Sequence, residues 1–172
     1  MWILLTFDSF PINVINEPTT LGFMSTRSRI GILNQDGSIE SVYHHSDGYP
    51  EWLGVVLKNK YSDSVKVREL MELGDISCIH TRRTWEGKEL EKPAIKTYNQ
   101  RGEKTQAMGH EDLAEYVMFD PGMIEFSYLW NTDLKEWKCY KSTWDFDWNI
   151  PLTPETVEIP NESRYLTASD FD

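Results

Sequence analysis

The densest group of side chains that could do chemistry lies at residues 43–50, where the sequence reads Tyr-His-His-Ser-Asp-Gly-Tyr-Pro. Imidazole and carboxylate groups are both zinc ligands, so a zinc site or a metal-dependent protein is one interpretation. Neighbouring side chains of an extended strand point to opposite faces, so His44 and His45 do not readily share one ion. The residues that could join such a site are His44, His45, Asp47, Cys78, His80, His110 and Cys139.

A structural interpretation of the same segment stays open beside the metal site. Asp47 could accept hydrogen bonds from the backbone of the following turn while His45 bonds to Asp47 and Tyr49 packs. The two cysteines, Cys78 and Cys139, are 61 positions apart and form no metal-type pair. We therefore expect no metal and no other cofactor.

Arginines precede this segment with a spacing that suits anion binding. Arg27 and Arg29 lie on one face of an extended segment, near the Tyr43 end of a predicted hairpin. Guanidinium groups bind phosphate through two hydrogen bonds, so these arginines, with Arg82, Arg83 and Arg101, could bind a small nucleotide. Salt bridges to the abundant carboxylates are the alternative. The candidate ligand-binding residues are Arg27, Arg29, Tyr43, His45, Asp47 and Tyr49.

Acidic side chains dominate the chain, with 28 Asp and Glu against 17 Lys and Arg and a net charge of −11. This charge argues against direct nucleic-acid binding and against an anionic membrane surface. From Met108 to the C-terminus there are only four basic side chains but fourteen acidic ones. Carboxylates alternating with aromatic rings could bind a basic groove of a partner protein, unless they form only a solvated rim. The candidate partner-binding residues are Trp144, Asp145, Asp147, Trp148, Glu155 and Glu158.

Sequence motifs of nucleophilic and phosphate-transfer enzymes are missing from the chain. There is no Gly-x-Ser-x-Gly, no P-loop, no His-Glu-x-x-His and no dinucleotide-binding fingerprint. We therefore expect a binding protein rather than an enzyme. The apolar first residues lack the basic start of a secretion signal, and no apolar stretch is long enough for a membrane helix, so we expect a cytoplasmic protein.

The elements that position these residues follow from hydrophobic spacing and turn residues. A length of 172 residues with 40% hydrophobic residues fits one domain with its own core. Residues 29–43 predict a hairpin that turns at Gly37, and residues 124–141 predict a second one. Helices are predicted from Pro50 to about Lys60, from Ser62 or Asp63 to Gly74, and over 110–118, with loop and short strands over 81–107.

These elements predict an α+β fold, with a mainly antiparallel sheet of hairpins and about three helices packed on it. We expect an N-terminal extension or arm over 1–23, a single α+β domain over 24–150 and an extended acidic tail over 151–172. Prolines at 151, 154 and 160 support the extended tail, since proline cannot donate a backbone hydrogen bond.

Three segments resemble a family of small proteins carried by phages and prophages. They are Met-Ser-Thr-Arg-Ser-Arg-Ile-Gly at 24–31, the histidine segment 43–50, and Leu-Gly-Asp-Ile-Ser at 73–77. The family usually has Tyr-Cys-His-Trp-Asp-Gly-Tyr in the middle segment, so this chain differs at His44 and Ser46. The residues before Met24 lie outside the resemblance.

The resemblance implies a non-enzymatic inhibitor of host defence, of the anti-CRISPR class, acting in the host cell cytoplasm. Such an acidic protein would occupy the basic nucleic-acid groove of a defence nuclease, and long-range attraction would speed the encounter. Sequestration of a small nucleotide signal is the alternative that the arginines favour.

Overall fold

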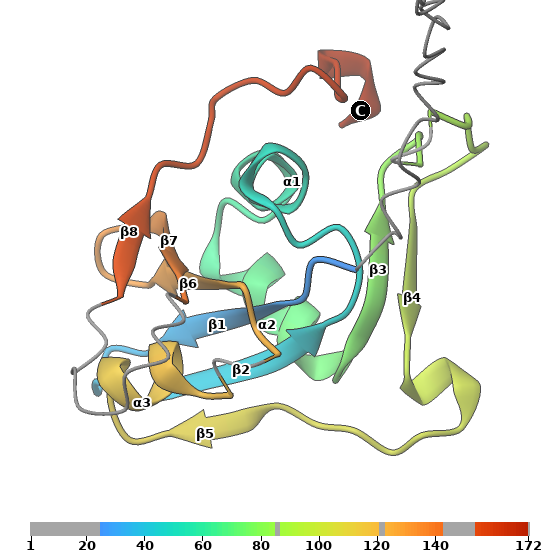
Figure 1. Cartoon of the computed structure of the whole chain (residues 1–172). Coiled ribbons are helices and arrows are strands. Elements are labelled where there is room, and N and C mark those ends of the chain that lie inside the picture. The colour runs from blue at the N-terminus through green and yellow to red at the C-terminus, as the bar shows by residue number, and fades with distance from the viewer. Residues whose placement is uncertain (1–24, 85–86, 121–122, 143–153, 172) are drawn as a thin grey trace, which may run out of the picture.

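The computed structural model describes residues 25–84, 87–120, 123–142 and 154–171. The expected arm over 1–23 and the aromatic and acidic segment 144–148 lie outside these residues. Within the described residues, eight strands form one sheet, and three α-helices pack on it (Figure 1). The strands are β1 (Ser28–Leu33), β2 (Ile39–His44), β3 (Ile76–His80), β4 (Ala94–Thr97), β5 (Met108–His110), β6 (Phe126–Asn131), β7 (Glu136–Lys141) and β8 (Glu155–Val157). The α-helices are α1 (Val55–Lys60), α2 (Ser64–Glu72) and α3 (Leu113–Met118).

The sheet has the order β4-β3-β2-β1-β6-β7-β8, and β5 pairs with β2 beside that row. The two predicted hairpins are confirmed as the antiparallel pairs β1–β2 and β6–β7. The sheet is nevertheless mixed, because β1 lies parallel to β6 and β2 lies parallel to β3. A parallel pair needs a crossover connection, which α1 and α2 provide between β2 and β3. The α+β class is therefore confirmed, while the expectation of a sheet built from hairpins describes only part of it.

Local signals place the first turns and helices where the sequence predicts them. Gly37 has φ +87° in the turn of the first hairpin, as its position requires. Pro50 begins a π-helical turn that continues into α1. The Asp63 carboxylate caps α2 by accepting a hydrogen bond of 2.9 Å from the Lys66 N–H. Gly74 follows the end of α2 with φ +70°.

Helix α3 is shorter than predicted and begins three residues later. The Asp112 carboxylate accepts a hydrogen bond of 2.8 Å from the Glu115 N–H, which fixes the start of the helix at Leu113. His110 consequently belongs to β5, where it pairs with Ile39 of β2. This correction moves His110 from a helix onto the sheet.

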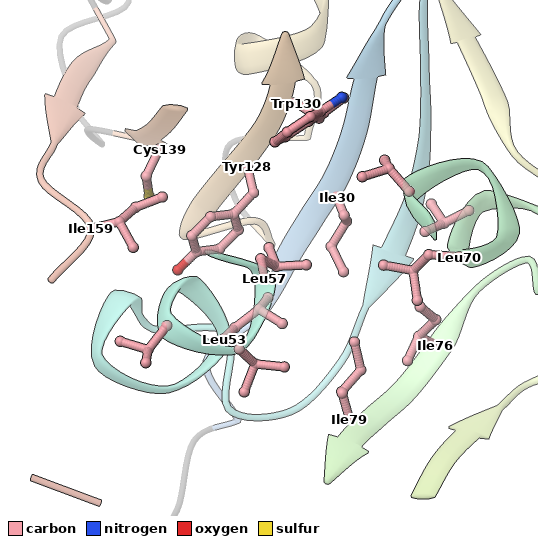
Figure 2. Packing of buried hydrophobic residues seen from close by; sticks show 14 of the residues in the cluster. Ile30, Leu53, Leu57, Leu70, Ile76, Ile79, Tyr128, Trp130, Cys139 and Ile159 are labelled. Carbon is pink, nitrogen blue, oxygen red and sulfur yellow. The ribbon is translucent and has the colours of Figure 1, made fainter. Parts of the chain in front are cut away.

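The main core lies between one face of the sheet and the helices α1 and α2 (Figure 2). Ile30 of β1, Leu53 and Leu57 around α1, and Leu70 of α2 are all fully or almost fully buried there. Side chains of β3, β6 and β7 complete the cluster, among them Ile76, Ile79, Tyr128, Trp130 and Cys139. Figure 2 shows side chains from the strands and from the helices gathered in one cluster.

The second face of the sheet has a smaller core under α3. Tyr116 and Val117 of α3 are buried against Ile39 and Leu129. The Tyr116 ring lies over Gly31 of β1, so closely that a Cβ there would stand 2.9 Å from the ring. Side chains of β1 that point away from α1 and α2 therefore lie on this second face. Some of them are covered by α3, and the others are not.

The C-terminal segment, which we expected to form an extended tail, packs over α1 after β8 (Figure 1). Ile159 and Leu166 are 7% exposed and belong to the main core. The Lys58 ammonium donates a hydrogen bond of 3.2 Å to the Ile159 carbonyl. Arg83 lies 3.6 Å from the Asp170 carboxylate. The described part of this segment is thus a structural component of the fold.

Candidate anion-binding site

The alternation of β1 and β2 decides which predicted site residues meet on the second face. Ile30 and Val42 pair across the two strands and enter the main core, so the neighbouring pair Arg29 and Tyr43 points to the other side. Arg27 precedes β1, and its carbonyl accepts a hydrogen bond of 2.9 Å from the Glu125 N–H, which extends the pairing beside β6. The spacing argument from the sequence therefore gives the correct face for these side chains.

We use the name outer patch for Arg27, Tyr43, His45, Tyr98 and Arg101. The Tyr43 hydroxyl and the Nδ1 atom of His45 are 2.8 Å apart. The Tyr43 ring meets the Tyr98 ring edge to face, with 6.1 Å between the centroids. The Arg101 guanidinium lies over the Tyr98 ring at 4.2 Å from its centroid. Two tyrosine rings thus stand between a histidine and an arginine that come from distant parts of the chain.

Asp75 holds the parts of the outer patch in place. Its carboxylate accepts a hydrogen bond of 2.8 Å from the Tyr43 N–H, and its carbonyl accepts one of 2.9 Å from the Tyr98 N–H. Its own N–H donates to the Thr105 hydroxyl at 2.8 Å. Asp75 therefore ties the end of β2 to the turn after β4, and this carboxylate is already engaged with backbone.

The electrostatics of the outer patch favour an anion. Burial lowers the pKa of His45, and the nearby Arg27 and Arg101 lower it further, so His45 is neutral at neutral pH. Burial raises the pKa of Tyr43, while Arg27 acts in the opposite direction. The Nε atom of Arg27 is buried and has no hydrogen-bond partner among the described residues. Arg101 has one exposed ion pair, with Glu103 at 3.8 Å.

Other residues of the predicted ligand set lie elsewhere. Tyr49 packs against the main core and meets Tyr165 edge to face at 6.2 Å, and burial raises the pKa of Tyr49 to about 12. Asp47 has φ +62° in the turn that leads to Pro50, a conformation that Asp tolerates better than most residues. Arg83 pairs with Asp170. Arg29 is buried beside Ser41, next to the outer patch but outside it.

The predicted metal ligands are distributed over several sites. His44 is fully buried on the core side, where its Nδ1 atom lies 3.1 Å from the Ser28 hydroxyl. Cys78 and His80 form a pair with 3.2 Å between Sγ and Nε2, and Cys139 is buried in the main core. Within the part of the chain that the structure describes, no three histidine, cysteine or acidic side chains are grouped so that they could hold a metal ion.

The predicted partner-binding residues are described only in part. Trp144, Asp145, Asp147 and Trp148 lie outside the described residues. Glu155 is exposed on β8, and Glu158 is exposed just after it.

Several other acidic side chains beyond Met108 have local roles. Asp112 caps α3, Glu136 lies 3.6 Å from Lys138, and Asp170 pairs with Arg83. Asp112 and Asp170 thus have roles within the fold, whereas Glu136 and Lys138 form an exposed ion pair.

Sequence reasoning missed Tyr98 in the outer patch. The signal that could have found it is the spacing Tyr-x-x-Arg at 98–101, which places an aromatic ring and a guanidinium on one side of a helical turn. Sequence reasoning also missed the contact of Arg29 with Ser41, because the two residues meet only through strand pairing.

Comparison of the chain with protein-family models, with curated proteins and with solved structures finds no match. In the described part of the chain, no helix has both the length and the apolar character needed to cross a membrane.

Proposed function

We propose that this protein binds a small nucleotide signal on its outer patch and acts as a non-enzymatic inhibitor of host defence by sequestering it. The anti-defence role comes from the resemblance to small phage and prophage proteins. The observation that carries the nucleotide is the meeting of Arg27, Tyr43, His45, Tyr98 and Arg101 on one face of the sheet.

The chemistry of the outer patch suits both parts of a nucleotide. Guanidinium groups bind phosphate oxygens through paired, charge-assisted hydrogen bonds, and Arg27 and Arg101 provide two of them. Tyrosine rings offer apolar faces on which a base can stack, and Tyr43 and Tyr98 provide these. Neutral His45 adds a ring nitrogen for a polar contact. Binding alone would remove the signal, so the proposal needs no catalytic group.

Calorimetric titration with nucleoside mono-, di- and triphosphates and cyclic dinucleotides tests this function. We expect at least one of them to bind with a dissociation constant below the millimolar range. Arg27→Met and Arg101→Met should each weaken this binding at least about tenfold, because each loses a charge-assisted hydrogen bond. Arg68→Met is the matched control, since Arg68 is an exposed arginine of α2 that pairs with Glu40. Absence of binding, or equal weakening in all three variants, would contradict the proposal.

Binding to a basic groove of a host defence nuclease is the second candidate. The exposed positions of Glu155 and Glu158 favour it, because β8 is an edge strand that a partner can reach. On this proposal Trp144, Asp145, Asp147 and Trp148, which precede β8 in the sequence, are also contact residues.

Charge reversal separates this candidate from nucleotide binding. Asp145→Lys combined with Asp147→Lys should abolish capture of the nuclease from infected cells, while Glu125→Lys combined with Asp133→Lys serves as the control. The captured complex should also weaken strongly with added salt, because exposed charges are screened over about 10 Å at 0.1 M salt. Capture that survives both the reversal and the salt would exclude a charge-led complex.

A further inference from the structure

Arg29 is a buried cation that lacks a carboxylate partner. Its side chain lies beneath α3, and the residue is only 5% exposed. Its guanidinium stands 4.7 Å from the centre of the Phe119 ring. Among the residues that the structure describes, no carboxylate oxygen lies within 4.0 Å of Arg29. A buried charge without a counter-charge is costly, which makes this position unusual for a purely structural arginine.

Among the described residues, Arg29 has one strong hydrogen-bond acceptor. A guanidinium has five N–H donors, and here the Nε donor reaches the Ser41 hydroxyl at 3.0 Å. The Nη2 donor points to the Met108 sulfur at 4.0 Å, and a thioether is a weak acceptor. Met108 is 42% exposed and belongs to the three-residue strand β5. The flexible, partly exposed Met108 side chain therefore lies where a strong hydrogen-bond acceptor for Arg29 could bind.

Ser41 and His110 hold this arrangement from the other side. The Ser41 hydroxyl accepts from Arg29 and lies 2.6 Å from the Nε2 atom of His110. When the Ser41 hydroxyl donates its proton in a hydrogen bond to Nε2 of His110, Nε2 acts as the acceptor. Neutral His110 then carries its own proton on Nδ1. Burial lowers the pKa of His110, and Arg29 lowers it further, so the neutral form is favoured. The single positive charge of the cluster is then that of Arg29.

Asp75 and Asp120 act on Arg29 only from a distance. Both raise the pKa of Arg29, but burial is the larger effect and lowers it. The Asp75 carboxylate is also engaged with the Tyr43 N–H. Neither acid forms an ion pair with Arg29 within 4.0 Å, so no carboxylate of the described residues neutralises it directly.

We propose that Arg29, held in place by Ser41, binds one phosphoryl group that enters by displacing the Met108 side chain. We call this the Arg29 site. A phosphoryl group fits better than a carboxylate because Arg27 stands two residues before Arg29, about 7 Å away along an extended chain, and two cations suit a dianion. The site goes beyond nucleotide sequestration, since it needs neither a base nor a sugar. Its phosphoryl group is either inorganic phosphate or the terminal phosphate of a nucleotide on the outer patch.

Thermal unfolding of the full chain in sodium phosphate and in sodium chloride, at equal pH and ionic strength, tests the proposal. At phosphate concentrations tenfold above the dissociation constant, linkage should raise the melting temperature by about 3 to 6 °C. Arg29→Met should abolish this rise and be at least as stable as the wild type in chloride, because it removes an unpaired buried charge. Arg68→Met, the same change at an exposed arginine, should keep the rise.

A second variant covers the case in which Arg29→Met does not fold. Met108→Ala removes the competing sulfur at an exposed position, so we expect it to bind phosphate at least as tightly as the wild type. Three results would overturn the proposal: no rise in the wild type, an undiminished rise in Arg29→Met, or loss of the rise in Met108→Ala. Sodium acetate producing the same rise would overturn the preference for a phosphoryl group.

Nucleotide titrations distinguish the two sources and keep this proposal separate from the proposed function. If the nucleotide places its terminal phosphate in the Arg29 site, inorganic phosphate should compete with it. Arg101→Met should then lose nucleotide affinity but keep the rise with phosphate. A rise with phosphate but no nucleotide binding would support the Arg29 site and contradict the proposed function. Nucleotide binding without any rise of the melting temperature in phosphate would support the proposed function and contradict the Arg29 site.

Discussion

Consecutive residues at the end of β2 go to opposite sides of the sheet, and this decides what each can bind. Tyr43 and His45 are only partly buried and contact each other on the second face. His44, between them, is fully buried on the core side beside Ser28. A buried histidine needs a hydrogen-bond partner and a neutral ring, which the Ser28 hydroxyl and the surrounding core provide.

His44 should make the stability of the protein depend on pH. Burial lowers the pKa of His44 from 6.5 to about 3. Between pH 6.5 and pH 3 the unfolded chain therefore binds a proton at this residue that the folded chain does not bind. Its contribution is complete above pH 6.5 and is lost as the pH falls toward 3. From about pH 7.5 to about pH 4.5 the free energy of unfolding should drop by about 3 kcal/mol through this residue. Urea denaturation at both values measures the drop.

His44→Gln is the variant that isolates this effect. Glutamine can still bond to Ser28 but does not titrate, so the difference between the two pH values should shrink. His45→Gln, at the partly buried neighbour, should leave most of the pH dependence in place. If His44→Gln and the wild type lose equal stability on acidification, His44 is protonated in the folded state.

At the scale of elements, the short helix α3 has an effect beyond its length. It places Tyr116 over Gly31 and leads to Phe119, whose ring lies against Arg29. The Tyr116 hydroxyl also donates a hydrogen bond of 2.6 Å to the Tyr128 carbonyl of β6. A helix of six residues is marginal by itself, so its cap and its packing on the sheet determine whether it forms.

The cap of α3 therefore predicts a measurable loss of stability. Asp112→Ala removes the acceptor of the Glu115 N–H and should lower the free energy of unfolding by about 1 kcal/mol. Asp112→Asn is the matched control, because asparagine caps helices equally well without the charge. Chemical denaturation compares the three proteins. Equal losses in both variants would show that the carboxylate acts through its charge.

At the scale of the whole molecule, the main core joins distant parts of the chain. Ile159 packs close to Gly54, where an added Cβ would stand 2.9 Å from the Ile159 side chain. Arg83 and Asp170 connect the loop after β3 to the C-terminal segment. The most acidic half of the sequence therefore contributes apolar contacts to the fold as well as charge.

Truncation of Ile159 should show that the C-terminal segment belongs to the same folding unit. Ile159→Ala removes a buried side chain that contacts α1 and should lower the free energy of unfolding by about 2 to 5 kcal/mol. Thr156→Ala, at an exposed position of β8, should change it little. Urea unfolding followed by tryptophan fluorescence measures both. A loss below about 0.5 kcal/mol for Ile159→Ala would indicate that the segment packs too loosely to support the core.

Local chemistry was enough to predict several parts of the protein. The two hairpins, the turn at Gly37, the helix cap at Ser62 or Asp63 and the stop at Gly74 follow from interactions between residues close in sequence. The structure uses Asp63 as that cap. The position of Arg29 on the same side of the sheet as Tyr43 follows from the alternation of extended strands. Such features depend on backbone conformation and short-range hydrogen bonds, which neighbouring residues largely determine.

Only the tertiary structure decided how these parts combine. The parallel pairs β1–β6 and β2–β3 bring together strands far apart in sequence, and no local pattern specifies such pairing. The approach of Tyr98 and Arg101 to Tyr43 depends on the position of β3 and β4 beside β2. The contact of His110 with Ser41 depends on the pairing of β5 with β2. Long-range pairing is selected by the burial of whole faces, and the cost of closing long loops is repaid only when the complete core forms.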